Sequence, residues 1–182
     1  MWEWLKRYAA NDDPLAEAAN TIALVVVSNQ PFYPLYVWWL VSDTIWPTLL
    51  TFLSTPLFAL VPAASRRHPL AGKALLVVAG IANTILSTWA FGKASAVEIF
   101  LLPCALIAAL LFRPSERAVG FALIGAAGLA WFWLGGLYPP ALHAYSAEEY
   151  GRFASLNIGS ASTLTIFVGL LGAGLIARRD AS

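Results

Sequence analysis

Residues 28–39 read Ser-Asn-Gln-Pro-Phe-Tyr-Pro-Leu-Tyr-Val-Trp-Trp, and they interrupt an apolar run between residues 21 and 41. A proline inside a helix removes one backbone hydrogen bond and clashes with the carbonyl group four residues earlier. Pro31 therefore frees the carbonyl of Val27, and Pro34 frees that of Gln30. Within lipid, each freed group needs a partner inside the protein. The stretch predicts a helix that kinks or unwinds here, with Asn29 or Gln30 turned into a bundle.

The composition indicates an integral membrane protein. Of the 182 residues, 59% are hydrophobic and 12% are charged, which is about half the charged fraction of a soluble domain. We expect one compact bundle without a soluble domain. Cys104, His68 and His143 are too few and too far apart in the sequence to predict a metal, haem or other cofactor site.

The apolar runs predict an all-α, polytopic membrane protein, a bundle of six transmembrane helices. Each run is close to the roughly 20 residues that a bilayer core requires. Residues 1–13 precede them as an interfacial segment, for which a disordered tail is the alternative. Two helix starts are predicted, by Asp13-Pro14 and by the capping-box pattern at residues 146–149. The predicted spans are residues 14–41, 45–64, 71–91, 97–112, 119–138 and 154–177.

The basic residues predict the orientation of the bundle. Six spans place both termini on one side, and cytoplasmic loops are enriched in lysine and arginine. We therefore expect cytoplasmic termini and an external loop over residues 139–153. Lys93 and Arg152 fall on the outer side, and the cytoplasmic side holds Lys6, Arg7, Arg66, Arg67, Lys73, Arg113, Arg117, Arg178 and Arg179.

Amides and aromatic rings within the spans predict where a ligand would bind. Buried amides are costly in lipid, so they mark either a functional site or hydrogen bonds that hold helices together. The aromatic residues gather toward the outer half, where they line an outward-facing pocket or form an interfacial belt. The candidate ligand-binding residues are Asn29, Gln30, Tyr33, Tyr36, Trp39, Asn83, Trp89, Glu98, Trp131 and Asn157. Of these, Glu98 also complements a helix dipole and lies within reach of Lys93.

Catalytic motifs of the common enzyme classes do not occur in the sequence. It has no Gly-rich phosphate loop, no HExxH pattern, no nucleophile elbow and no paired carboxylates within a span. No charge lies deep in a predicted span, which argues against an ion-coupled pump. We expect no catalytic residues and no nucleic-acid partner; an enzyme acting through Glu148, Glu149 and His143 is the alternative.

Two stretches resemble the six-helix membrane sensor modules that precede kinase or cyclase domains in some bacterial receptors. Residues 29–40 place prolines, aromatics and tryptophans in a first span. Residues 91–104 join a glycine-bearing outer turn to a Phe-Leu-Pro span, which Leu111-Phe112-Arg113 closes. The resemblance implies a sensor in the bacterial inner (cytoplasmic) membrane that binds a small lipophilic ligand or membrane lipid.

No kinase or cyclase domain follows Arg178-Arg179 in this sequence. The resemblance therefore leads us to expect a stand-alone module, a truncated chain or a subunit. Two other functions remain open. One is an accessory or structural subunit of a larger membrane complex, with a protein partner or a homo-oligomer at the aromatic surface. The other is a small transporter.

Overall fold

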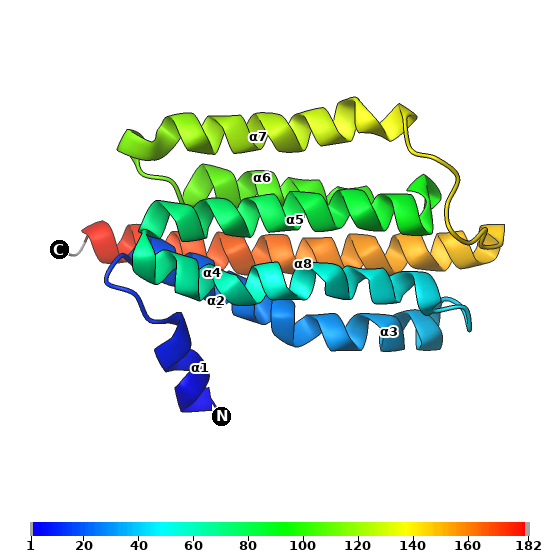
Figure 1. Cartoon of the computed structure of the whole chain (residues 1–182), viewed down its shortest axis with the longest axis horizontal. Helices are drawn as coiled ribbons and strands as arrows, with labels where there is room; N and C mark the ends of the chain where they lie inside the picture. The colour runs from blue at the N-terminus through cyan, green and yellow to red at the C-terminus, as the bar shows by residue number, and fades with distance from the viewer. Residues whose placement is uncertain (1, 181–182) are drawn as a thin grey trace.

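The computed structural model describes residues 2–180, which contain helices and no strand. Consecutive helical rods run back and forth along one axis, and the two ends of the chain lie at the same end of the bundle (Figure 1). The label η denotes a 3-10 helix. In chain order the elements are α1 (Trp2–Ala9), α2 (Pro14–Asn29), η1 (Gln30–Phe32), α3 (Tyr33–Leu40), η2 (Trp46–Ser54), α4 (Thr55–Arg67), α5 (Pro69–Phe91), η3 (Lys93–Ser95), η4 (Val97–Phe100), α6 (Leu101–Leu110), η5 (Pro114–Glu116), α7 (Arg117–Phe132), η6 (Leu134–Gly136) and α8 (Ala147–Asp180).

Helix length supports fewer membrane spans than the six expected. In the described part of the chain, three helical segments are long and apolar enough to cross a membrane: Trp46–Arg67, Pro69–Phe91 and Ala147–Ala177. A bent pair, Val97–Leu110 with Pro114–Phe132, raises the number to four if the pair is one span. The predicted first span falls short because η1 divides it into helices of 16 and 8 residues. A six-span bundle is therefore not confirmed.

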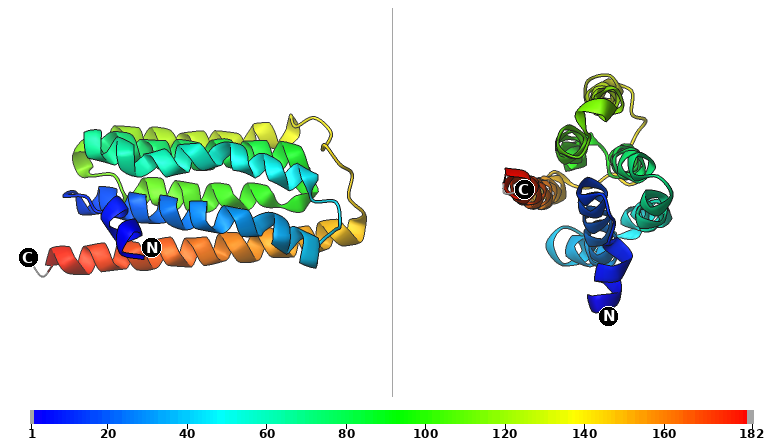
Figure 2. Two further views of the ribbon diagram at one scale, coloured as in Figure 1. Left: turned by 60° about the horizontal axis from the view of Figure 1, so that its bottom comes forward. Right: turned by 90° about the vertical axis from the view of Figure 1, so that its left-hand side faces the viewer.

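The first rod, α2–η1–α3, packs against the second rod, η2–α4, and the rods that follow also pack in sequence order. Helix α4 packs along α2 and α5, α6 packs along α7, and α8 lies against α6. Helix α7 forms the side of the bundle away from α1 (Figure 2). The short α1 lies obliquely at one end, where the Tyr8 hydroxyl donates to the Ala59 carbonyl at 3.0 Å.

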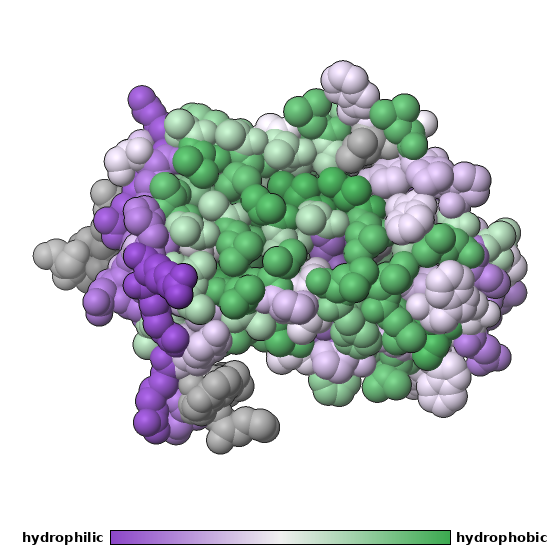
Figure 3. Space-filling view, in the orientation of Figure 1, coloured by the Kyte–Doolittle hydropathy of each residue, from purple (hydrophilic) through white to green (hydrophobic). Residues whose placement is uncertain are grey.

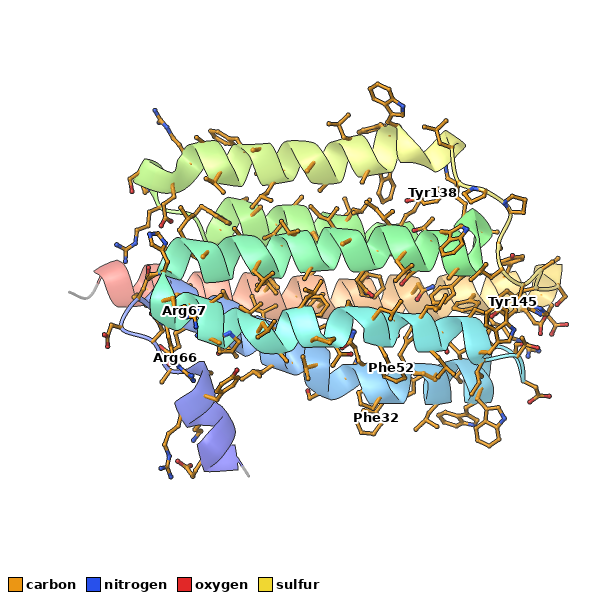
Figure 4. All side chains as sticks on the ribbon, viewed as in Figure 1. Phe32, Phe52, Arg66, Arg67, Tyr138 and Tyr145 are labelled. Carbon is orange, nitrogen blue, oxygen red and sulfur yellow. The ribbon has the colours of Figure 1, made fainter. Side chains whose placement is uncertain are left out.

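The surface is banded along the bundle axis. Hydrophilic residues gather at the end that carries α1, and apolar residues cover the middle (Figure 3). Arg66 and Arg67 lie at this hydrophilic end, whereas Tyr138 and Tyr145 lie at the opposite end (Figure 4). An apolar band between two polar ends is the surface that a bilayer core accommodates.

Both predicted helix starts are confirmed. Asp13 Oδ1 accepts a hydrogen bond from the Leu15 amide at 2.9 Å, with Pro14 at the first helical position. Ser146 N donates to Glu149 Oε2 at 2.7 Å, and Glu149 N donates to Ser146 Oγ at 3.2 Å. This capping box opens α8 directly, so the last helix begins earlier than residue 154 and runs without a break.

A buried ion cluster closes the bundle at the α1 end. The Lys73 side chain of α5 is fully buried, and its Nζ lies 2.6 Å from Glu116 Oε2 and 3.8 Å from Asp13 Oδ2. Arg113 Nη2 lies 3.2 Å from Asp13 Oδ1. The sequence placed Lys73 at the cytoplasmic side but gave no sign of its burial, because the carboxylates that neutralise it come from other elements.

We predict that Lys73→Met lowers the free energy of unfolding by about 3–5 kcal/mol, because it leaves the poorly solvated Glu116 carboxylate without its counter-charge and Asp13 with Arg113 alone. The control is Arg152→Met, which removes an exposed ion pair with Glu148 on α8 and should cost less than about 1 kcal/mol. Chemical unfolding in detergent measures both. Equal losses would contradict a structural role for the buried cluster.

Candidate ligand-binding cavity

The interruption expected between residues 27 and 34 is present at η1. Helix α2 ends at Asn29. Pro34 has no amide hydrogen to donate to the Gln30 carbonyl, which instead accepts a 3-10 hydrogen bond from the Tyr33 amide. The Gln30 side chain is 7% exposed, whereas Asn29 is exposed. Of the two amides, the structure therefore turns Gln30 into the bundle.

The Gln30 side chain binds a row of hydroxyl residues on the neighbouring rod. Its Nε2 donates to Thr51 O at 3.0 Å and to Ser54 Oγ at 2.8 Å, and its Oε1 accepts from Thr55 Oγ1 at 2.7 Å. Thr48, Thr51 and Ser54 are three residues apart, a spacing that aligns side chains on one face of a 3-10 helix. All three are buried. This spacing is the sequence signal for the partner of Gln30 that our sequence analysis missed.

A cavity of about 1010 Å³ lies beside this network, between α2, η1, α5, α6 and α8. Small-molecule sites typically measure roughly 300–1,000 Å³, with a mostly apolar wall and a few polar groups. The apolar wall includes Ile22, Val26, Phe58, Leu76, Ile107, Leu164 and Phe167. The polar groups that line it include Asn29, Gln30, Thr51, Asn83, Ser87, Ser155, Ser160 and Thr163.

The cavity opens at the side of the bundle, between η1–α3 and α8. Phe32 is 50% exposed and Tyr36 is 37% exposed, although both line the cavity. On the facing helix, Gly159 and Thr163 are likewise exposed and part of the lining. Phe32 projects away from the bundle at a point between its two ends (Figure 4). This lateral opening differs from the outward-facing pocket expected from the sequence.

An aromatic cluster closes the end of the bundle opposite α1. The Tyr145 hydroxyl donates to the Thr44 carbonyl at 3.1 Å, and its ring meets those of Phe153 and Tyr150 edge-on, with centroids 5.2 and 5.6 Å away. Burial, followed by the nearby Tyr150 and Glu149, raises the pKa of Tyr145 to about 12. The hydroxyl is protonated at neutral pH, as that of an unperturbed tyrosine also is, and it donates to Thr44.

The structure brings part of the candidate set together. Asn29, Gln30, Tyr33, Tyr36 and Asn83 line the cavity. The fully buried Asn157 lies in the wall behind them: its Oδ1 accepts from the Tyr33 hydroxyl at 2.9 Å, and its Nδ2 donates to Ser95 O at 2.8 Å. That amide holds α8 against α3 and η3.

The other candidates lie outside the cavity lining. Trp39 is 77% exposed near the end of α3, and Trp89 lies near the end of α5. Trp131 belongs to α7, where it packs against the main apolar core. Glu98 pairs with Lys93 at 3.9 Å, as their spacing suggested. Sequence could not separate these residues from the lining ones, because helix packing decides which face of each helix meets the cavity.

These features define a helical membrane-type bundle with a mostly apolar side cavity. The MASE7 family model matches residues 6–170, and the chain therefore belongs to the MASE7 family. MASE domains are membrane-associated sensor domains of bacterial signalling proteins, which agrees with the sensor-module resemblance of the sequence. Comparisons with curated proteins and with solved structures give no significant match.

We predict that Gln30→Leu destabilises the protein, because Thr55 Oγ1 and the hydroxyl row of η2 lose a buried partner. Each buried polar group left unpaired costs about 1–3 kcal/mol. Asn29→Leu is the matched control, since its amide is exposed at the neighbouring position and should cost under about 0.5 kcal/mol. Melting temperatures in mild detergent compare the two. A Gln30→Leu protein as stable as the parent would rule out this network as the anchor of η1.

Proposed function

We propose that this chain is the sensory module of a bacterial membrane signalling protein, and that a small lipophilic ligand or lipid binds in its side cavity. Membership of the MASE7 family supports the sensor class. One observation supports the binding of a ligand: a cavity of about 1010 Å³ opens between η1–α3 and α8. A molecule dissolved in the bilayer reaches this opening without crossing water. The proposed role is binding, without catalysis.

Helix α8 is the element through which ligand binding would be transmitted. It runs from the closed aromatic end, past the cavity, to the hydrophilic end of the bundle. Among the α8 residues whose burial is described, the buried ones form one narrow row: Phe153, Asn157, Ala161, Val168 and Gly172. Leu156, Ser160 and Leu164 lie beside this row and line the cavity. Because so little of α8 is packed, a ligand against this face changes a large share of its contacts.

We further propose six crossings of the bacterial inner membrane with both termini cytoplasmic. The alternating direction of the rods supports this orientation, and so does the position of Arg66 and Arg67 at the α1 end. The first crossing would be α2–η1–α3, broken at its middle. A break inside a span is tolerated where the freed backbone groups are satisfied within the protein, as the Gln30 carbonyl is here.

Cysteine labelling tests this topology. In a Cys104→Ala background, Ala10→Cys and Ser146→Cys place single thiols at two exposed positions, at the start and at the far end of the bundle. A membrane-impermeant maleimide added to intact cells should modify Ser146→Cys, and should reach Ala10→Cys only after the membrane is opened. Modification of both thiols in intact cells would exclude the proposed orientation.

Filling the cavity mouth tests ligand binding. A Cβ atom added at Gly159 meets no atom within 4 Å, and Gly159 lines the cavity. We predict that Gly159→Leu abolishes binding of a co-purifying lipophilic molecule without loss of stability. Gly174→Leu is the control: it lies on the same helix, also in open space, and away from the lining. Native mass spectrometry after purification in mild detergent measures retention. A molecule bound equally by both variants, or none in the parent, would refute the proposal.

A further inference from the structure

Three buried amide side chains of the bundle have both their nitrogen and their oxygen hydrogen-bonded within the protein. Asn20 donates to Ala9 O at 2.8 Å and accepts from Ser65 Oγ at 2.7 Å. Gln30 and Asn157 are likewise paired at nitrogen and oxygen. These three amides therefore have structural roles, since the nitrogen and the oxygen of each already bind groups of the protein.

Asn83 on α5 differs from these three. Its Oδ1 accepts from Ser54 Oγ at 2.9 Å, which shares its one proton with the Thr51 carbonyl at 2.7 Å. No residue in the described range accepts a hydrogen bond from its Nδ2. Asn83 also lines the cavity. An amide donor without a protein partner in the lining of a cavity is available to an acceptor atom on a ligand.

Ser87 adds a second unpaired group on the same face of α5, one turn further along. It is 2% exposed and lines the cavity. Among residues 2–180, no side chain or backbone group pairs with its hydroxyl. Its neighbours Thr84 and Thr88 behave differently, since each donates to the carbonyl four residues earlier at 2.8 Å. Asn83 and Ser87 together form a small neutral polar site in the cavity wall.

The charge of the lining decides which head group this site accepts. The described residues that line the cavity include no Lys, Arg, His, Asp or Glu. A charged head group would lose its water there without gaining a counter-charge, a cost far larger than one hydrogen bond returns. The wall thus favours neutral molecules and disfavours phospholipid head groups, carboxylates and ammonium ions.

We propose that the ligand is an uncharged amphiphile, whose hydroxyl or carbonyl oxygen accepts a hydrogen bond from Asn83 Nδ2 and interacts with Ser87. Its apolar body lies against Phe58, Leu76 and Ile107 in the same cavity. This inference rests on the proposed function, since it assigns the head group of the ligand that the cavity would bind.

Probes that share a twelve-carbon chain and differ only in the polar or charged head group test whether the site prefers a neutral head group. Nanodiscs carrying the full chain are incubated with radiolabelled dodecanol, dodecane, dodecylphosphonate or dodecyltrimethylammonium, and empty nanodiscs give the partitioning blank. Dodecanol should bind saturably, and the other three at least roughly tenfold more weakly. Asn83→Leu should weaken dodecanol binding roughly fivefold, since it removes one hydrogen bond. Ser87→Ala, which needs no repacking, should weaken it similarly.

The outcomes separate this inference from the proposed function. If dodecane or a charged probe binds as tightly as dodecanol and Gly159→Leu still blocks it, the cavity binds ligands but the neutral polar site is wrong. Unchanged dodecanol affinity in both Asn83→Leu and Ser87→Ala also overturns the site. Absence of saturable binding by all four probes overturns the site as well. The proposed function is tested separately, by whether the parent and Gly174→Leu proteins retain a co-purified molecule that Gly159→Leu loses.

Discussion

The hydrogen bonds between the Gln30 side chain and η2 join the first two rods of this bundle at η1, where the first rod is broken. Pro31 and Pro34 remove two backbone donors, and within lipid each freed carbonyl needs a partner inside the protein. The switch from α to 3-10 geometry supplies the Gln30 carbonyl with a donor, the Tyr33 amide. The side-chain amide then ties the break to Thr51, Ser54 and Thr55. The residues of this break also form one wall of the side cavity, so the same constraint shapes the fold and the candidate site.

Polar groups inside the bundle divide into two kinds. Asn20, Gln30 and Asn157 are hydrogen-bonded at both nitrogen and oxygen and join elements that are distant in sequence. Asn83 and Ser87 instead keep free groups at the cavity. The first kind supplies stability and fixes which faces of the helices meet. The second kind forms the small polar site that we propose binds the head group of the ligand.

Local features of the fold were predictable from the sequence, and tertiary ones were not. The prolines, the Asp13 cap and the Ser146–Glu149 box act through neighbours within four residues, so the break and the helix starts followed from the sequence alone. The burial of Lys73 depends on carboxylates from two other elements. Likewise, Trp39 and Trp131 are aromatic residues of the kind that line cavities. In the packed bundle, however, Trp39 is exposed and Trp131 of α7 packs against the main apolar core. Which amides remain free for a ligand depends on pairings that only the packed bundle reveals.

An experimental structure of the full chain in lipid nanodiscs, determined with dodecanol present, tests this account most directly. We expect elongated density in the cavity between η1–α3 and α8, with its polar end within hydrogen-bonding distance of Asn83 Nδ2. Gln30 should remain bonded to η2 in the same structure. Direct contact between the first rod and α8 along their whole length, with the cavity closed and no density between them, would contradict a membrane-accessible binding site in this MASE7 protein.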